Sequence, residues 1–400
     1  MDLAEPVMRV MEPAMLRFCQ WRGDPVARWV LPETKADPYP LYDDIRDRGL
    51  VHSPLGPYVT ASHGCAEAIL RDPRFSSPPG LARDCLPPSG TDDTAADPGG
   101  HDVVRDLLSG VFTPRVTDSL EPRVRDIVTR LLNAAGGNGF DLIGALAFPL
   151  PIAVICALLG VPPGDQALFH GWGHDVAAAV EPSSRRDAAA GTHSAGLAVT
   201  AYLKDLVTAR RTVPDDSLLS ALIASGAGDD DLVAAALLLL DAGFETVVNL
   251  IGNGVVALLS EPPSWERLAA DPALMPGAVE EILRYDSPVQ LTTRIADDDI
   301  EIEDTTLREG ATVMVAIGGA NRDPEVFDQP DRLRIDRPDA SRHLSFSPGA
   351  HHCLGARLAR LEARIALEEL TRRHPRLRLT GPPVRRPLLV LRGFESVPVA

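Results

Sequence analysis

The feature that most constrains the fold of this 400-residue chain is one long apolar stretch, residues 232–260. Its sequence, LVAAALLLLDAGFETVVNLIGNGVVALLS, is apolar on nearly every face of a helix. Three acids, Asp229, Asp230 and Asp231, precede it, where negative charge favours a helix N-terminus. A helix that is apolar all round has to be buried. The stretch therefore predicts a long central helix that runs through the core of a helical protein.

Helical periodicity also covers much of the remaining chain. Apolar residues recur three and four positions apart in the segments 101–260, 264–285 and 353–374. Short strands are expected within 289–317, where TVMVAI is the best candidate, and in the last 25 residues. The 36 prolines and 32 glycines are spread along the chain, which excludes a long coiled coil or a uniform solenoid. We expect one mainly α domain over 1–400 with minor β-sheet, including an N-terminal extension over 1–36 and a flexible lid loop over 87–100.

Charge and cysteine usage narrow the class of protein. The formal net charge of -17 argues against nucleic-acid binding. Five cysteines without a CxxC pair indicate neither a disulfide framework nor a structural zinc site, so we expect a cytoplasmic protein. The uncharged stretch 142–164 contains four prolines, which favours two buried helical pieces over a membrane span.

The segment FSPGAHHCLG, residues 346–355, carries the sharpest chemical signal. Cys353 lies just before a helix, and a helix N-terminus and nearby cations lower the pKa of a thiol. A Cys353 thiolate at neutral pH would be a nucleophile or a metal ligand. A structural cysteine is the alternative from composition, and a zinc site with His351 and His352 lacks a second ligand cluster.

These residues resemble the haem-binding loop FxxGxHxCxG of the cytochromes P450, the haem-thiolate monooxygenases. Glu281–Arg284 is similar to the ExxR motif of that family, and Ala242–Thr246 to its [AG]GxET motif. Residues 321–332, NRDP followed by PDR, resemble the segment that completes a Glu–Arg–Arg network. The resemblance covers most of the chain from about Asp37 and implies the P450 fold, haem b as cofactor and dioxygen as co-substrate. It points to the soluble bacterial members of the actinomycete natural-product type, with no membrane anchor.

The resemblance implies a role for each matching residue around the haem. Cys353 is the axial ligand of the iron, Phe346 packs on the thiolate side, and Gly349 and Gly355 let the backbone approach the haem. The residues expected to bind the haem propionates are His101, Arg105, Arg294 and His351, with His343 as a weaker candidate. The structural network would consist of Glu281, Arg284 and Arg332. One departure from the pattern is Ser347, which stands where glycine is usual.

The central helix would carry the catalytic residues. By resemblance, Thr246 contributes a hydroxyl and Glu245 an acid that relays protons during dioxygen activation, in a helix that opens locally at Ala242 and Gly243. The alternative is that both side chains are merely satisfied within the helix.

Asp241 is the residue most informative about the substrate. An acid in a mostly apolar pocket is costly unless it is paired, so we expect it to accept a hydrogen bond from a substrate N–H, O–H or ammonium group. The alternative is a protein donor or a water-filled channel. By matching position, the other substrate residues are Leu238, Val289 and Gln290, and the lid would include 87–100 and about 169–180.

Residues 353–400 hold ten arginines and four acids, in contrast to the acidic remainder of the chain. By resemblance this region accepts electrons from an acidic ferredoxin supplied by a ferredoxin reductase. The expected docking residues are Arg357, Arg360, Arg364, Arg372 and Arg373, although a solvated helix face would have the same composition.

We therefore expect a monomeric monooxygenase that hydroxylates or oxidatively couples a small natural product in secondary metabolism. The alternative from another class is a catalytically weak haem-fold protein that binds a ligand or recruits an intermediate.

Overall fold

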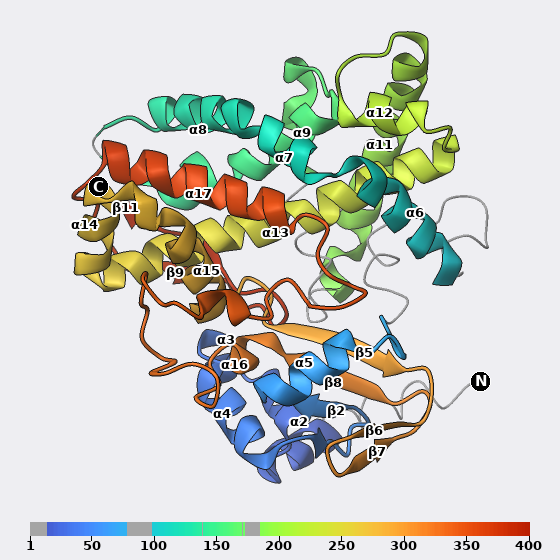
Figure 1. The fold of residues 1–400 in the computed structure, drawn as a ribbon, viewed down its shortest axis with the longest axis vertical. Helices are drawn as coiled ribbons and strands as arrows, with labels where there is room; N and C mark the ends of the chain where they lie inside the picture. Colours follow the sequence, from blue (N-terminus) through green and yellow to red (C-terminus); the bar gives the residue numbers. More distant parts are fainter. Residues whose placement is uncertain (1–13, 78–97, 138, 170, 173–184) are drawn as a thin grey trace.

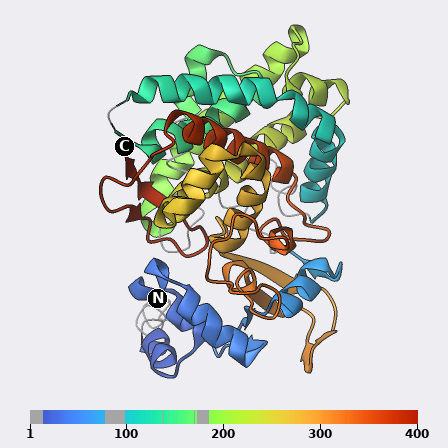
Figure 2. The ribbon, with the colours of Figure 1, turned by 60° about the vertical axis from the view of Figure 1, so that its left-hand side comes forward.

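A computed structural model describes residues 14–77, 98–137, 139–169, 171–172 and 185–400, which form a large helical lobe and a smaller lobe built on a sheet (Figure 1). The two lobes keep this arrangement when the molecule is turned (Figure 2). The mainly α architecture with minor sheet agrees with the sequence prediction.

The helical lobe is built around α13 (Asp229–Ser260), which begins at the three acids noted above. The other helices of the lobe are α6 (Pro98–Val111), α7 (Pro114–Ser119), α8 (Glu121–Ala135), α9 (Pro149–Leu159), α11 (Arg185–Thr212), α12 (Leu218–Ala224), α14 (Pro262–Ala270), α15 (Met275–Tyr285) and α17 (Ala356–Arg373). Helix α13 contacts α6, α9, α11, α15 and α17. Its Phe244 is 2% exposed and meets the ring of Phe148 edge to face, at 4.9 Å between centroids. Burial of one such side chain stabilises the fold by about 1.5–3 kcal/mol.

Helix α13 is long and apolar enough to cross a membrane by length and composition, but 61% of its most apolar window is buried inside the protein. The stretch 142–164 forms two buried pieces, as predicted: the π-helical turn η1 (Ile143–Ala147) and α9. Pro149 and Pro151 lie in the first turn of α9, where the backbone N–H groups have no helical acceptor.

The smaller lobe contains a five-stranded sheet with the order β1-β2-β8-β5-β3. Its strands are β1 (Val51–His52), β2 (Tyr58–Thr60), β3 (Phe75–Ser76), β5 (Leu291–Ala296) and β8 (Thr312–Ala316). Strand β2 runs parallel to β8, and the other pairs are antiparallel. The helices of this lobe are α2 (Pro25–Trp29), α3 (Pro32–Ala36), α4 (Tyr39–Arg48), α5 (His63–Arg71) and α16 (Ile317–Ala320).

Short elements complete the fold. The paired strands are β6 (Ile300–Ile302) with β7 (Thr305–Leu307), β9 (Val384–Arg385) with β10 (Phe394–Ser396), and β4 (Phe140–Asp141) with β11 (Pro398–Val399). The 3₁₀ turns are η2 (Pro163–Asp165), η3 (Pro272–Leu274) and η4 (Ala340–Arg342). The last 25 residues thus contain the short strands that were expected.

Some predicted boundaries differ from the structure. Trp29 is 1% exposed and packs against Tyr42 at 5.7 Å, so α2, which lies within the predicted N-terminal extension, packs into the core of the sheet lobe. Residues 98–100 form the first turn of α6, while the rest of the lid loop, 87–97, lies outside the described residues. Phe169, expected in the second lid segment, is buried in the helical core, and 173–180 lie outside the described residues.

Candidate active site

One turn of α13 is exposed although most of the helix is buried. Ala242 is exposed and Thr246 is half-buried, whereas Phe244 and Glu245 between them are buried. The Thr246 hydroxyl donates to the Ala242 carbonyl at 3.0 Å. The helix is continuous here, so the local opening that we expected at Ala242 and Gly243 is not present in this structure.

Behind this turn, the Glu245 carboxylate forms an ion pair with a C-terminal arginine. Glu245 is 3% exposed, and its Oε2 accepts a hydrogen bond from Nη1 of Arg386 at 2.6 Å. Its other oxygen, Oε1, is buried and has no donor among the described residues. A buried carboxylate is costly without a counter-charge, and Arg386 supplies that counter-charge. No motif in the sequence singles out Arg386, which lies 141 residues after its partner.

Asp241 lies one turn before Glu245 on the same helix. Its Oδ1 is buried without a donor from the described part of the chain. Burial raises the pKa of Asp241 to about 6. The side chain therefore has an unused hydrogen-bonding position, as the substrate hypothesis requires.

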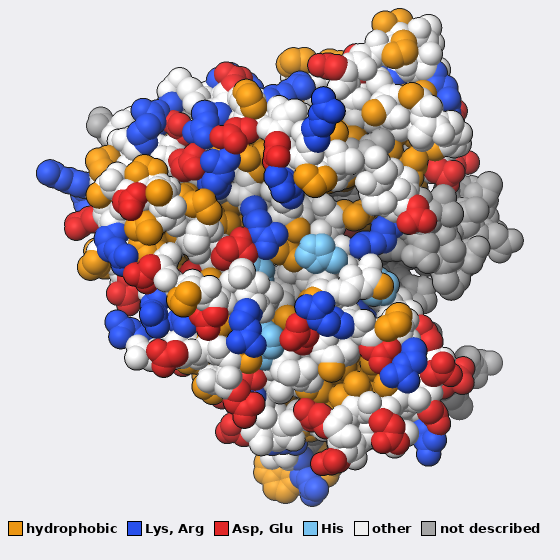
Figure 3. Space-filling model, viewed as in Figure 1, with side chains coloured by type: hydrophobic (Ala, Val, Ile, Leu, Met, Phe, Trp, Pro, Cys, Tyr) orange, Lys and Arg blue, Asp and Glu red, His pale blue; other side chains and the backbone are white. Residues whose placement is uncertain are grey.

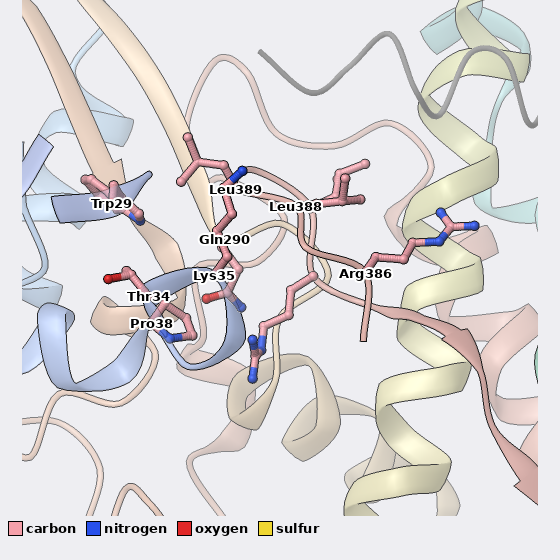
Figure 4. Close-up of a pocket in the computed structure, with 10 residues that line it drawn as sticks. Trp29, Thr34, Lys35, Pro38, Gln290, Arg386, Leu388 and Leu389 are labelled. Carbon is pink, nitrogen blue, oxygen red and sulfur yellow. The ribbon is translucent and has the colours of Figure 1, made fainter. Parts of the chain in front are cut away.

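The other three predicted substrate residues have different surroundings. Leu238, on α13, and Val289, which bridges to Leu391, are half-buried. Gln290 is 1% exposed, and its Nε2 donates to the Ser287 carbonyl at 2.8 Å. It lines a pocket walled by α2, α3 and the 386–392 segment (Figure 4). Gln290 thus faces the N-terminal helices, which sequence matching did not indicate.

The Cys353 loop closes on itself before α17. The Cys353 N–H donates to the Phe346 carbonyl at 2.9 Å. Gly349 has φ +94°, and a Cβ there would lie 2.3 Å from the carbonyl oxygen of Leu70 at the end of α5. Glycine is therefore required at 349 by contact with α5, which is a different reason from the predicted approach to haem. Gly355, the residue before α17, has a negative φ of -80°.

Opposing effects act on the pKa of the Cys353 thiol. Surrounding protein atoms raise its pKa, while the amides of Gly355 and Ala356 and the guanidinium groups of Arg105 and Arg360 lower it. The net direction is upward, in contrast to the lowered pKa that the sequence predicts. Coordination to a metal ion would deprotonate the sulfur.

Arg294 is a buried cation beside this loop. It is 3% exposed, and its Nη2 donates to the Ser347 hydroxyl at 2.7 Å, while Nη1 donates to Thr292 and Thr293 oxygens. Its Nε is an unsatisfied buried donor, and no carboxylate pairs with it among the described residues. Burial lowers the pKa of Arg294 to about 10. Such a guanidinium requires an anion, and a haem propionate is one.

The other residues predicted to bind the haem propionates differ in their contacts. Nη2 of Arg105, on α6, donates to the His352 carbonyl at 2.5 Å, which joins α6 to the Cys353 loop. His101 is on the same helix, but its side chain lies outside the described part of the structure, and His351 is half-buried in the loop. His343 is turned elsewhere: Nε2 lies 3.2 Å from Oε2 of Glu280, and Nδ1 accepts from the Ser345 N–H. Both nitrogens are engaged within the protein, which argues against its propionate role.

Phe346 is contacted by an arginine of α17 that is itself bound to an acid of α15. The Arg360 guanidinium lies 4.4 Å from the centre of its ring, and Arg360 Nε donates to Glu280 at 2.6 Å. Burial favours the neutral form of Glu280, but Arg360 and His343 outweigh it and lower the pKa of that carboxyl to about 2. Glu280, the neighbour of the ExxR glutamate, is a supporting residue that sequence reasoning missed.

The Glu–Arg–Arg network is present with a different third member. Nε of Arg284 donates to Glu281 at 2.7 Å, and both side chains are fully buried. The third partner is Arg337, whose Nε lies 3.1 and 3.0 Å from the two oxygens of Glu281. Arg332 is exposed, and its guanidinium donates to the side chain of Gln329. The prediction of Arg332 is therefore wrong; only its carbonyl joins the network, where it accepts from Arg284 and Arg337.

The physical reason lies in the path of the chain. In the sequence PDRLRIDR, three arginines follow one another closely, and spacing does not show which one turns inward. Gln329, with φ +47°, turns the chain so that the carbonyls of Asp328 and Gln329 also accept from Arg337.

The arginines expected to form a docking face are all paired with acids of this chain. The pairs are Arg357–Asp118 at 2.7 Å, Arg360–Glu280 at 2.6 Å, Arg364–Glu121 at 2.7 Å, Arg372–Glu369 at 2.6 Å and Arg373–Glu369 at 3.4 Å. Figure 3 accordingly shows basic and acidic side chains interleaved over α8 and α17. The excess positive charge of this part of the sequence is therefore largely compensated in space.

Together, the fold, the Cys353 loop at the start of α17 and the unpaired Arg294 define a haem-thiolate protein. Comparison with known proteins agrees. The cytochrome P450 family model matches residues 205–375. The chain is 38% identical to the cytochrome P450 monooxygenase PikC of Streptomyces venezuelae, over 91% of each chain. It is 39% identical to the vitamin D(3) 25-hydroxylase of Pseudonocardia autotrophica, over 91% of this chain and 93% of that one.

Solved structures give the same result. P450BioI in complex with a hexadec-9Z-enoic acid-ligated acyl carrier protein superposes with a TM-score of 0.83 at 35% identity, covering 92% of this chain and 98% of that chain. The chain belongs to the cytochrome P450 family. It is a monooxygenase that uses haem b, with dioxygen as co-substrate.

The described residues fit this cofactor. Cys353 would ligate the iron, Arg294 and Arg105 would hold propionates beside the Cys353 loop, and exposed Ala242 offers a small side chain on α13. When bound, the haem supplies the redox chemistry that activates dioxygen. The protein's own residues would bind and orient it.

Proposed function

We propose that this monooxygenase hydroxylates or oxidatively couples a small natural product that carries a hydrogen-bond donor, an N–H, O–H or ammonium group. The observation that carries the proposal is the segment 241–246 of α13, where exposed Ala242 and half-buried Thr246 lie beside Asp241 and buried Glu245. Both reactions require the same site, so the proposal includes both. The 37% identity to the 6-deoxyerythronolide B hydroxylase of Saccharopolyspora erythraea, over 86% of this chain, supports a role in secondary metabolism.

In this proposal Thr246 and Glu245 are the catalytic residues. The Thr246 hydroxyl is the donor at the exposed turn, and it can release the Ala242 carbonyl by rotation about one side-chain bond. Glu245 is the buried acid that resupplies the proton. The presence of both residues disfavours the alternative of a catalytically weak haem-fold protein.

Asp241 would recognise the substrate. Its unpartnered Oδ1 can accept a hydrogen bond, and an ammonium or amide donor would compensate the cost of burying the acid. A substrate without a donor would leave that cost in place.

An absorption titration of the ferric protein tests this recognition. The panel would contain cyclic dipeptides as N–H donors and neutral terpenoids and macrolide-like polyketides as comparisons. We expect a low-to-high-spin shift with donor compounds, weakened about 10-fold or more by Asp241→Ala, as for loss of a hydrogen bond to a charged group. Asp231→Asn, at the exposed start of α13, is the matched control and should bind as the parent does. Equal affinity of the parent and Asp241→Ala would refute the role of Asp241.

We also propose that electrons come from a ferredoxin and its reductase in the cytoplasm, and that the protein acts as a monomer. Arg357 and Arg372 are the docking residues best suited to a partner, because their side chains are 54% and 65% exposed despite their ion pairs. Reversal of both charges should slow reduction by a ferredoxin and weaken its dependence on salt. Unchanged reduction kinetics would exclude this face.

A further inference from the structure

The ion pair of Glu245 links the central helix to the C-terminal hairpin. Arg386 directly follows β9 and is anchored there, since its N–H donates to the Gly393 carbonyl at 3.2 Å. Its guanidinium reaches α13 while the following residues line the pocket with Gln290 and Lys35 (Figure 4). The only contact that crosses from Arg386 to Glu245 among the described residues is the 2.6 Å bond to Oε2.

The rest of the hairpin is fixed independently of this pair. Nη2 of Arg385 and Nε of Arg392 donate to the two oxygens of Asp286 at 2.8 and 2.7 Å. Burial opposes ionisation of Asp286, but the two arginines outweigh it and hold the pKa of that carboxyl far below its usual range. The hairpin that places Arg386 beside Glu245 is therefore held by other ion pairs, those with Asp286. Loss of the Arg386 side chain should leave the position of the hairpin unchanged.

We infer that Arg386 is a positioning residue for proton relay, which orients the Glu245 carboxylate so that one of its oxygens stays free of protein donors. This inference rests on the proposed role of Glu245. A fixed cation at Oε2 leaves Oε1 as the oxygen that can take up and release a proton, and no described residue donates to Oε1.

The burial of Glu245 explains why its carboxylate needs a cationic partner such as Arg386. Glu245 is buried, and Arg386 is the cation that pairs with it among the described residues. Without Arg386, neither carboxylate oxygen of Glu245 would have a donor among the described residues, so the carboxylate would lose its fixed orientation and relay would slow.

The test uses the haem-loaded enzyme with NADPH, a surrogate ferredoxin and its reductase, and no added substrate. Two electrons and two protons reduce dioxygen to hydrogen peroxide, whereas four electrons and four protons reduce it to two water molecules. The fraction released as peroxide and the solvent isotope effect on dioxygen consumption therefore report proton delivery. We expect Arg386→Gln to slow consumption about 10-fold, less than the 10²–10⁴-fold typical of losing an acid–base group, and to raise both readouts.

Three comparisons make the result specific. Arg386→Lys, which keeps a cation, should restore most of the parent behaviour, and Glu245→Gln/Arg386→Gln should match Glu245→Gln, because the two residues act as one unit. Arg385→Gln, the neighbouring arginine with a structural partner, should lower the unfolding midpoint and leave the isotope effect unchanged.

The outcomes separate the two proposals. If Glu245→Gln behaves as the parent, the proposed role of Glu245 fails. If Glu245→Gln changes both readouts but Arg386→Gln does not, the inference about Arg386 is overturned.

Discussion

Replacement of Arg337 should destabilise the protein far more than replacement of Arg332, although the two residues are five positions apart. Arg337 is buried, and its guanidinium donates to both oxygens of Glu281 and to the carbonyls of Asp328, Gln329 and Arg332. The side chain of Arg332 is exposed and makes one hydrogen bond, to Gln329.

The magnitudes follow from these contacts. Breaking a buried ion pair by removing one partner costs about 3–5 kcal/mol. Glu281 keeps Arg284 at 2.7 Å in the variant, so we expect Arg337→Ala to lie near the lower end, about 3 kcal/mol. Arg332→Ala retains the backbone carbonyl that joins the network, and an exposed substitution changes stability by about 0.5 kcal/mol or less.

The assay is urea unfolding of the haem-loaded variants at one protein and haem concentration, followed by far-ultraviolet circular dichroism. A large fall of the midpoint for Arg337→Ala with a near-parental midpoint for Arg332→Ala is expected. Equal losses in the two variants, or a parental midpoint for Arg337→Ala, would refute the assignment of Arg337 as the third member.

Two further predictions concern strain and buried charge. Ser347 has φ +54° and accepts a hydrogen bond from Arg294. Ser347→Ala keeps the backbone strain and loses the hydrogen bond, so it should destabilise the protein by about 1.5–3 kcal/mol in thermal unfolding. Ser347→Gly should destabilise it by less, because glycine relieves the strain. Equal losses would show that strain is not released. Burial raises the pKa of Glu362 on α17 to about 8, so the native state holds a proton that the unfolded state releases, and stability should fall as pH rises from about 4.5 through 8. Glu362→Gln should remove this slope in denaturant titrations at several pH values, and a retained slope would contradict it.

The compensated arginines of α17 show why charge counts in sequence do not predict a surface potential. Arg364 belongs to the basic C-terminal region, but its partner Glu121 comes from α8, more than 240 residues earlier. Opposite charges that are far apart in sequence meet in the fold. The excess of arginine in residues 353–400 therefore does not produce an equally basic surface.

Periodicity and short motifs determined much of this protein. The apolar stretch over 232–260 predicts α13 because a helix without a polar face has to lie in the core, whatever surrounds it. The proline-rich stretch over 142–164 predicts two short helices, since proline is tolerated in a first turn and not in a helix interior. The motif around Cys353 predicts the haem-thiolate class because its glycines, histidine and cysteine lie within one local loop. Such features depend on neighbours in sequence, so the sequence alone contains them.

Tertiary structure decided the partners of the charged groups. Arg337 replaces Arg332 because the turn at Gln329 directs one side chain inward. Glu245 pairs with Arg386 because the C-terminal hairpin returns to α13. Gly349 is needed because α5, from the other lobe, approaches it. Ion pairs and close contacts depend on which elements meet in space, and their energies come from burial, which is a property of the whole fold and not of any short segment.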